Sequence, residues 1–410
     1  MKSRQPHVVL VTWVLLFTFE TALAQQPLSF PKIDRRPAPM SFDFTRKIPL
    51  SFVPKFDHSS TNPAQADVQS YRFVDLDLRQ SLDDLLYLTF DTRTVWPARL
   101  PAEFGPGQIL ELGKTPGLGI GSLHSRGITG KGVGIGIVDQ PLLVSHQEYA
   151  AQLRLYEEQN IVARTPAQMH APATASIAVG KTVGVAPEAD LYFIALWNGD
   201  GIGTAQFTFN FKYPAQGIRR LIALNRELPP ERRIRVISIS VGWMKGQNGY
   251  DDIVAACTEA MEAGIAVFSC TEGMNGRDYY GLGRSPRSDP NDFRAYEPPI
   301  YASIEGIRQW LPRKLLVPMD SRVLASPCGD DVYVLYRTGG FSWCPPYLAG
   351  VYALAAQVDP AMTPDRFWKI ATTTARAIKS SQKGQEMTLS IIDPVALINS
   401  IEDQRRNSTR

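Results

Sequence analysis

Three polar residues that lie far apart in the sequence have surroundings that suit catalytic side chains, and Asp139 is the first of them. It directly follows the apolar run 133–138. In an open parallel sheet, reactive side chains gather at the carboxyl ends of the strands and in the loops after them. An aspartate in such a place also serves simply as the hydrogen-bond acceptor of the next turn. Asp139 alone therefore allows either role.

Histidine is scarce in this chain, with five residues in 410, and His170 stands apart from the others. It precedes a run of small residues, 171–179, that is typical of a tightly packed helix. A histidine at the start of a helix can act as a general base, because the first turn of a helix is free for hydrogen bonds. It can equally be a helix cap or a buried structural histidine, so both interpretations stay open.

The segment Gly339–Gly350 (GGFSWCPPYLAG) gives the sharpest local signal. Its two leading glycines allow a sharp approach of the chain, and Pro345 and Pro346 are tolerated only where a helix is just beginning. Ser342 is therefore expected at a helix N-terminus, where free N–H groups and the helix dipole favour a developing negative charge. Such a place suits a nucleophilic serine. An ordinary N-cap serine explains the helix start but not the two glycines.

The chain from Gly105 onward predicts the scaffold that these residues need. Apolar runs typical of strands buried in a parallel sheet recur along it, at 133–138, 191–196, 234–241 and 265–268. Helical patterns lie between them, for example over 251–263, and Thr363 followed by Pro364 is expected to begin a late helix. Strands that alternate with helices predict an α/β fold with a doubly wound, mostly parallel sheet and helices on both faces.

The N-terminal quarter of the chain differs in composition. No glycine occurs before Gly105, whereas residues 25–66 contain seven prolines. This composition predicts an extended or poorly ordered arm, followed by a short strand near 74–78 and a helix near 82–88. Residues 25–104 are therefore expected to form an N-terminal extension. The polar residues 401–410 are expected to be a frayed tail.

Residues 1–24 have the features of a signal peptide, with basic residues at Lys2 and Arg4, an apolar stretch over 8–19 and small residues at Ala22 and Ala24. The apolar stretch is shorter than the roughly 20 residues of a membrane-spanning helix. Cleavage after Ala24, export to the periplasm or the medium, and no integral membrane segment in the mature chain are therefore expected. The charge balance of 43 basic and 40 acidic residues argues against nucleic acid as a partner.

Four cysteines lie in the C-terminal half of the chain, at positions 257, 270, 328 and 344. Export permits disulfides, but four cysteines allow several pairings and the sequence does not choose among them. Buried free thiols are an equally good interpretation. The absence of a Cys-x-x-Cys spacing argues against a zinc site.

In chain order and spacing, these segments resemble the subtilisin-like serine proteases, the subtilases. Residues 123–139 are similar to the family's entry into its first catalytic strand, and 170–176 to its histidine block. Residues 184–192 (GVAPEADLY) are similar to the family's Gly-Val-Ala-Pro segment, and 339–350 to its serine block. The resemblance covers about residues 120–380. Its specificity comes from the order of the blocks and not from any single one.

The resemblance implies a triad of Asp139, His170 and Ser342, in the chain order of subtilisin. Ser342 would attack the peptide carbonyl, His170 would take its proton, and Asp139 would hold the imidazole tautomer. His146 matches a family histidine that follows the aspartate. The strand whose backbone pairs with substrate corresponds to Ser240, Val241 and Gly242.

The chain departs from the family pattern most seriously at the oxyanion hole. The family asparagine falls on Gly273, whereas Asn275 would serve only after a rearrangement of the loop, and Glu272 only if protonated. One oxyanion donor contributes about 2.7–4 kcal/mol of transition-state stabilisation. Its loss would slow the enzyme without abolishing activity, because the Ser342 N–H remains. In addition, Phe341 replaces a family threonine whose hydroxyl assists the oxyanion.

The resemblance implies that residues 105–400 form an exported serine endopeptidase that hydrolyses peptide bonds through an acyl-enzyme, with a peptide or protein as substrate. Residues 25–104 would then be a propeptide or a plain arm. The departures leave open a catalytically impaired pseudoprotease that binds peptides or proteins or has a regulatory role. An unrelated esterase is disfavoured, because no Gly-x-Ser-x-Gly follows a strand.

No cofactor is required by this interpretation. Calcium commonly stabilises members of the family, and the segment Asp289–Asp292 offers oxygen ligands. Such a polar segment is usually only a turn. The sequence therefore predicts no defined metal site.

Overall fold

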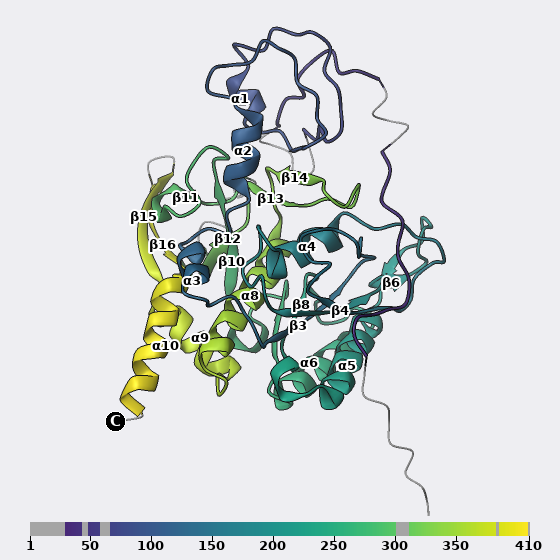
Figure 1. The fold of residues 1–410 in the computed structure, drawn as a ribbon, viewed down its shortest axis with the longest axis vertical. Coiled ribbons are helices and arrows are strands. Elements are labelled where there is room, and N and C mark those ends of the chain that lie inside the picture. The colour runs from purple at the N-terminus through teal and green to yellow at the C-terminus, as the bar shows by residue number, and fades with distance from the viewer. Residues whose placement is uncertain (1–28, 43–47, 58–65, 301–310, 383–384, 409–410) are drawn as a thin grey trace, which may run out of the picture.

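A six-stranded parallel sheet forms the centre of the fold in the computed structural model (Figure 1). The structure describes residues 29–42, 48–57, 66–300, 311–382 and 385–408, so the predicted signal peptide lies outside the described residues. The strands lie in the order β1 (Lys32–Ile33), β4 (Leu153–Glu158), β5 (Asp190–Ala195), β3 (Gly134–Asp139), β8 (Ile234–Ile239) and β9 (Ala266–Ser269). The last four of these strands lie at the apolar runs of the sequence.

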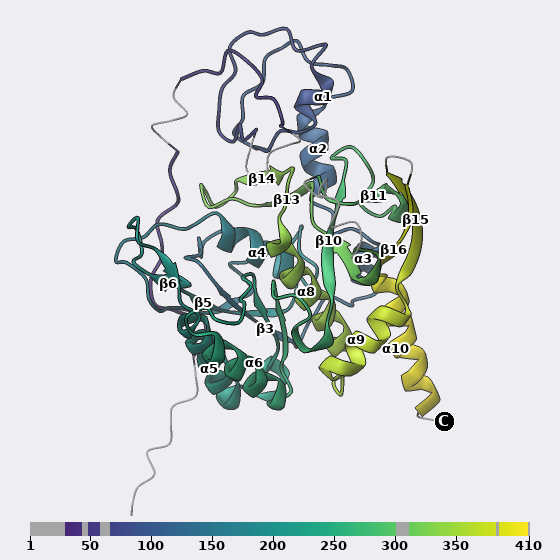
Figure 2. The ribbon, with the colours of Figure 1, turned by 180° about the vertical axis from the view of Figure 1, so that it is seen from behind.

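Both faces of this sheet are covered by helices, because successive side chains of a strand point to opposite faces. In β3, Ile135 and Ile137 pack into the core that includes α4 (His170–Val179) and α8 (Cys344–Val358). Val138 instead packs into the core with α5 (Lys212–Glu227) and α6 (Tyr250–Glu262). Figures 1 and 2 show α5 and α6 on one side of the sheet and α4 and α8 on the other. The predicted α/β fold with a doubly wound parallel sheet is confirmed.

Three smaller sheets surround this centre. One has five strands in the order β11 (Tyr296–Glu297), β10 (Tyr279–Arg284), β12 (Leu315–Pro318), β16 (Gln385–Ile391) and β15 (Arg376–Gln382). Another has the order β13 (Arg322–Ala325), β14 (Tyr333–Tyr336) and β2 (Phe90–Asp91), and a hairpin joins β6 (Gly199–Asp200) to β7 (Thr208–Phe209). The other α-helices among the described residues are α1 (Leu82–Leu85), α2 (Pro106–Gly113), α3 (Ile120–Ser125), α9 (Pro364–Thr373) and α10 (Pro394–Ser408).

The ends of the C-terminal helices follow from their capping residues. Helix α9 begins at Pro364, and the Thr363 hydroxyl accepts a hydrogen bond from the Arg366 N–H, as predicted for a threonine cap. Helix α10 continues through Ser408. The prediction of a frayed tail from residue 401 is therefore wrong for 401–408, where Ile401 is fully buried.

The N-terminal extension packs against the rest of the protein. Residues 66–104 coil at one end of the molecule (Figure 1), where β2 pairs with β14 and Phe73, Phe90 and Phe104 enter the same core as α4 and α8. Residues 29–42 supply β1, which pairs in parallel with β4 at the edge of the main sheet. Residues 29–42 are extended, as one alternative of the prediction had it, but they are not poorly ordered, because they pair with β4. Residues on both sides of Gly105, where the glycine distribution suggested a domain boundary, therefore pack into one core.

The four cysteines are free thiols, and Cys257, Cys328 and Cys344 are buried whereas Cys270 is half-buried. This arrangement agrees with the interpretation as buried small residues. Within the described residues, none of the helices is long and apolar enough to cross a membrane. Among the described residues, no group of three or more His, Cys, Asp or Glu side chains is arranged to hold a metal ion.

Candidate active site

Asp139 and His170 form a hydrogen-bonded pair at the carboxyl end of the central sheet. Asp139 is the last residue of β3 and is 5% exposed, and His170 is the first residue of α4. The distances from His170 Nδ1 to Asp139 Oδ1 and Oδ2 are 2.7 and 2.9 Å. A carboxylate at Nδ1 keeps the proton on that nitrogen, so Nε2 is left as the basic atom of the ring.

Two further donors fix the orientation of the Asp139 carboxylate. The Gln140 N–H donates to Oδ1 at 2.7 Å, and the Thr174 hydroxyl donates to Oδ2 at 2.9 Å. Thr174 is fully buried and lies four residues after His170 on α4. Residues at this spacing share a helix face, so His170 and Thr174 meet the same carboxylate. The sequence contained this spacing, but a single threonine among small residues gave no reason to select it.

Replacing Thr174 by valine should lower kcat by roughly 10- to 100-fold, because a hydrogen bond to a charged group contributes about 1.5–3 kcal/mol. Valine keeps the shape of the buried side chain but leaves Asp139 with one donor fewer. We expect KM to stay unchanged and Thr174→Ser to restore kcat. Peptide hydrolysis by the two variants measures this difference. A valine variant as active as wild type would show that the hydroxyl does not act through Asp139.

The charge on Asp139 alters the proton affinity of His170. Burial of the ring lowers the pKa of His170, but the Asp139 charge and hydrogen bond together outweigh burial, so that this pKa lies above its ordinary value. His170 must be neutral to act as a base. Activity should therefore be lost as the pH falls, with half of kcat/KM remaining at a pH above about 6.5. A rate profile from pH 4 to 9 tests this, and a midpoint below the ordinary histidine value would contradict it.

Ser342 lies in η5 (Phe341–Trp343), a short 3-10 helix directly before α8, as the sequence predicted. Gly340 has a φ of 85°, a conformation that L side chains rarely adopt. A side chain at Gly339 would meet the main-chain oxygen of Met319 and the ring of Trp343. Both glycines are therefore needed to bring the chain into the serine turn. An ordinary N-cap does not require them.

The Ser342 hydroxyl contacts the residue that follows β8. It donates to the main-chain oxygen of Ser240 at 3.3 Å, while the Ser240 hydroxyl donates to the main-chain oxygen of Ser342 at 2.7 Å. Cys270 lies near Ser342: burial raises the pKa of the Cys270 thiol to about 12, and the Ser342 side chain opposes this rise. Among the described residues, no hydrogen bond joins Ser342 to His170. The ring of the neighbouring Trp343 instead lies 5.4 Å from the His170 ring.

A small hollow of about 90 Å³ opens beside these residues. It is lined by Val138, Asp139, Gln140, His170, Asn198, Ser240 and Val241. Ser240 therefore faces the hollow with His170 and is also hydrogen-bonded to Ser342. Gly242 follows, and a side chain there would meet the main-chain oxygen of Cys270. The segment predicted to bind substrate thus lies between the histidine and the serine.

The three candidate oxyanion donors are placed differently by the structure. The Glu272 side chain is 66% exposed, and Lys314 Nζ approaches its carboxylate at 3.4 Å. In that ion pair Glu272 accepts and does not donate. Gly273 has a φ of 61° and offers only its N–H. Asn275 lies in η2 (Met274–Gly276), and its side chain is outside the described part of the structure.

His146, which matched a family histidine, has a structural environment. It is fully buried, its Nε2 contacts the Val332 main-chain oxygen at 3.0 Å, and its Nδ1 accepts from the Glu148 N–H. This arrangement places the single proton of a neutral ring on Nε2. Burial lowers the pKa of His146. His146 is therefore a buried structural residue and not a member of the candidate triad.

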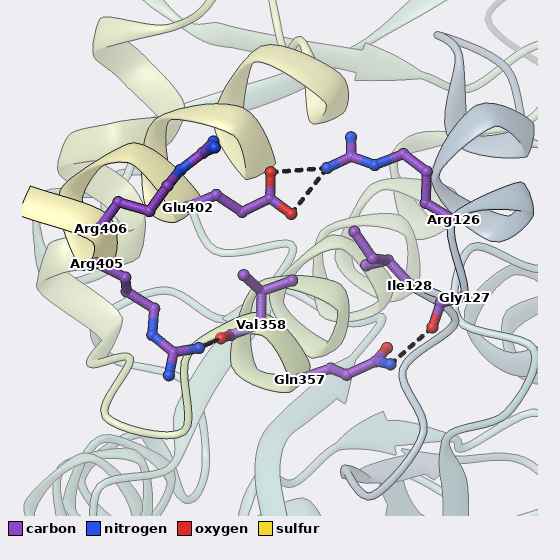
Figure 3. A pocket seen from close by; sticks show the side chains of 8 residues that line it. All are labelled: Arg126, Gly127, Ile128, Gln357, Val358, Glu402, Arg405 and Arg406. Carbon is purple, nitrogen blue, oxygen red and sulfur yellow. Dashed lines mark hydrogen bonds and ion pairs between the residues drawn. The ribbon is translucent and has the colours of Figure 1, made fainter. Parts of the chain in front are cut away.

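A wider hollow of about 640 Å³ lies between α10 and the chain after α3 (Figure 3). Arg126 in this hollow pairs with Glu402, and the Arg405 guanidinium donates to the Val358 main-chain oxygen. Arg406 pairs with Asp403. The contacts of Glu402 and Arg405 tie α10 to the domain, whereas the Arg406–Asp403 pair lies within α10. The lining includes none of the three candidate triad residues.

The segment Asp289–Asp292 forms a turn. The Asp289 carboxylate accepts from the Asn291 N–H, and the Asp292 carboxylate accepts from the Arg294 N–H. These are the local hydrogen bonds with which aspartate stabilises turns. The carboxylates therefore fit the turn interpretation better than a calcium site.

Comparison with known proteins identifies related sequences over this region. Residues 130–295 match the sequence model of the subtilase family. The proteins named subtilisin-like protease 4 from Arthroderma benhamiae and Trichophyton verrucosum are 26% identical to this chain over 260 residues. That alignment covers 62% of this chain and 59% of each relative, so the match spans about three fifths of the relatives' length.

Among solved structures, the prenylagaramide maturation protease PagA gives a TM-score of 0.48 at 12% identity, over 69% of this chain and 98% of that chain. The PatG macrocyclase domain gives a TM-score of 0.47 at 13% identity, over 70% of this chain and 96% of that chain. The sequence match over 130–295 contains Asp139, His170 and the segment 240–242, whereas Ser342 lies beyond it.

Proposed function

We propose that the protein is a serine endopeptidase that hydrolyses peptide bonds, because residues 130–295 match the sequence model of the subtilase family and relatives named subtilisin-like proteases align with the chain. Ser342 is the nucleophile, His170 the general base and Asp139 the residue that orients the imidazole. The observation that carries this proposal is the buried Asp139–His170 pair, which lies across Ser240 from the serine turn. A carboxylate bound to Nδ1 of an otherwise uncommitted histidine is the arrangement that activates a serine hydroxyl.

In the first step, the Ser342 hydroxyl leaves the main-chain oxygen of Ser240 and turns toward His170 Nε2. The contact it gives up is long, at 3.3 Å, so the rotation costs little. Catalytic hydrogen bonds are often absent before substrate binds and form in the complex. His170 then takes the proton as Ser342 Oγ attacks the peptide carbonyl. The resulting imidazolium is stabilised by the Asp139 carboxylate.

The tetrahedral oxyanion and the substrate backbone use the neighbouring main chain. Ser342 precedes the buried helix α8, whose dipole favours negative charge near its start, and because Pro345 and Pro346 have no N–H, the main-chain donors there are those of Ser342 and its direct neighbours. The substrate lies as an added strand along Ser240, Val241 and Gly242. His170 returns its proton to the leaving amine, and water then hydrolyses the acyl-enzyme. An export signal at residues 1–24 is part of the proposal, and it puts this activity in the periplasm or the medium.

A fluorophosphonate probe, which reacts with activated serine hydroxyls, tests the proposal. Labelling of the wild-type protein and none of the Ser342→Ala variant is expected. Equal labelling of both proteins, or none of either, would overturn the proposed peptidase activity and favour the alternative. That alternative is a non-catalytic protein that retains the groove, and the exposed, ion-paired Glu272 near the expected oxyanion position favours it.

A further inference from the structure

The loop that leads into His170 is held by a segment more than 120 residues away in the sequence. This loop, residues 159–169, connects β4 to α4. Asn160 and Arg164 in it have φ angles of 47° and 66°, in the left-handed region that non-glycine residues rarely occupy. The residue before His170, Met169, provides no side-chain cap for α4. Contacts from outside the loop must therefore hold its conformation.

Residues 29–42, which we name the strap, supply several of these contacts. Arg35 Nε and Nη2 donate to the two carboxylate oxygens of Glu158, each at 2.7 Å. Arg35 Nη2 also donates to the main-chain oxygen of Thr165 at 2.8 Å. One guanidinium thus joins the end of β4 to the middle of the loop. A planar fork of donors suits this role, whereas a lysine offers a single point of contact.

A second contact lies closer to the histidine. The Ala167 N–H, three residues before His170, donates to the main-chain oxygen of Ala38 at 2.9 Å. The next residue, Gln168, donates its N–H to the Pro141 main-chain oxygen at 2.9 Å. Pro141 follows Asp139 by two residues. The strap is therefore linked through Ala167 and Gln168 to both members of the Asp139–His170 pair.

The strap is itself fixed to the main sheet. Strand β1 extends the sheet beyond β4, and the Asp34 N–H donates to the Tyr156 main-chain oxygen at 2.9 Å. Lys32 pairs with Glu157 at 2.8 Å, and the ring of Phe30 packs edge-on against Tyr192. The dark purple segment beside β4 and β6 in Figure 1 follows this path. Release of the strap would leave β4 as an unpaired sheet edge.

We propose that the strap is retained in the mature protein and that Arg35 is a positioning residue for the loop that carries His170. Arg35 contacts neither substrate nor the reacting atoms. It acts by holding residues 159–169, so that the imidazole stays against Asp139. The role in catalysis rests on the proposed function, whereas retention of the strap and its effect on the loop do not.

The test compares Arg35→Gln with Arg36→Gln, which removes the same charge from the neighbouring exposed residue. Hydrogen exchange followed by mass spectrometry should be at least tenfold faster over 159–169 in Arg35→Gln alone. The rate of fluorophosphonate labelling should fall about tenfold in the same variant, with little change in the urea midpoint. Equal loop exchange in the two variants would overturn the positioning role. Faster exchange spread over the whole chain would overturn it as well.

Two further measurements keep the test decisive. Should Arg35→Gln fail to fold, Glu158→Gln removes the partner charge and is expected to give the same local increase in exchange, and unchanged exchange there would overturn the proposal. The intact mass of the mature exported protein should correspond to an N-terminus before residue 29, and one after residue 42 would contradict retention. Absence of labelling in wild type would overturn the proposed function, while the exchange and mass results would still decide the strap.

Discussion

Replacing Ser342 by alanine should lower kcat for the hydrolysis of a labelled casein roughly a millionfold, the loss expected when a serine nucleophile is removed from a working triad. The hydroxyl of Ser240, which lines the hollow beside His170, does not replace it, because it donates to the Ser342 main-chain oxygen. In the proposed complex, the substrate backbone pairs with Ser240–Gly242 and not with the Ser342 hydroxyl. KM should therefore change little.

The alanine variant should fold, because the hydroxyl makes only a 3.3 Å contact and the Ser240 donor keeps its main-chain acceptor. Ser125→Ala is a matched control, since that exposed hydroxyl donates to the Gly121 main-chain oxygen one turn earlier in α3. Casein hydrolysis and thermal unfolding of both variants are the measurements. Substantial residual hydrolysis by the folded Ser342→Ala variant would remove Ser342 from the nucleophile role.

Replacing Asp139 by asparagine should lower kcat about ten-thousandfold while the fold is retained. The fixed Gln140 N–H requires an acceptor oxygen on its side of the side chain. The asparagine NH₂ group is then directed to the other side, where the Thr174 hydroxyl can rotate to accept from it. This NH₂ group also faces His170 Nδ1, so Nδ1 must accept a hydrogen bond instead of donating one. The proton moves to Nε2, and the ring can no longer act as a base.

The kinetics of Asp139→Asn at several pH values measure this effect. The rate should recover only slightly at high pH, because the defect is in the tautomer and not in the total charge of the ring. Asp330→Asn is a control of the same chemical change, at a carboxylate that accepts from the exposed Ser145 hydroxyl. An Asp139→Asn enzyme within tenfold of wild type would contradict the orienting role.

The central sheet was predictable because its strands are buried on both faces. Such strands read as continuous apolar runs, and the runs at 133–138 and 234–241 became β3 and β8 within two residues at each end. The serine turn was also legible, since glycines and prolines constrain the backbone locally. Both signals depend on short stretches of sequence and not on distant partners.

The position of the strap could not be predicted, because its contacts depend on residues that are distant in the sequence. Strand β1 has two residues, and its stability comes from β4, more than 120 positions away. Its prolines and its lack of glycine are compatible with an edge strand as much as with a free arm. The contacts of Arg35 with Glu158 and Thr165 likewise depend on the tertiary fold.

Helix α10 continued past Ile401 because that residue is buried against the domain.

The pairing of Asp139 with His170 followed from chain order and family resemblance, whereas their shared partner Thr174 did not. The environment of Ser342 was only partly foreseen. The Cys270 thiol lies beside it, although the sequence offered this cysteine only as a buried thiol or a member of a disulfide. Proximity between residues 72 positions apart leaves no local pattern in the sequence. Residues such as these are found only once the fold brings them together.

The central claim is that Ser342 is the side chain activated by the Asp139–His170 pair. Tandem mass spectrometry of the protein after reaction with the fluorophosphonate tests it most directly, because the fragment masses identify the modified residue. The account predicts one adduct per chain, on Ser342. An adduct on Ser240 or Cys270, the two neighbours that contact Ser342, or no adduct at all, would contradict it.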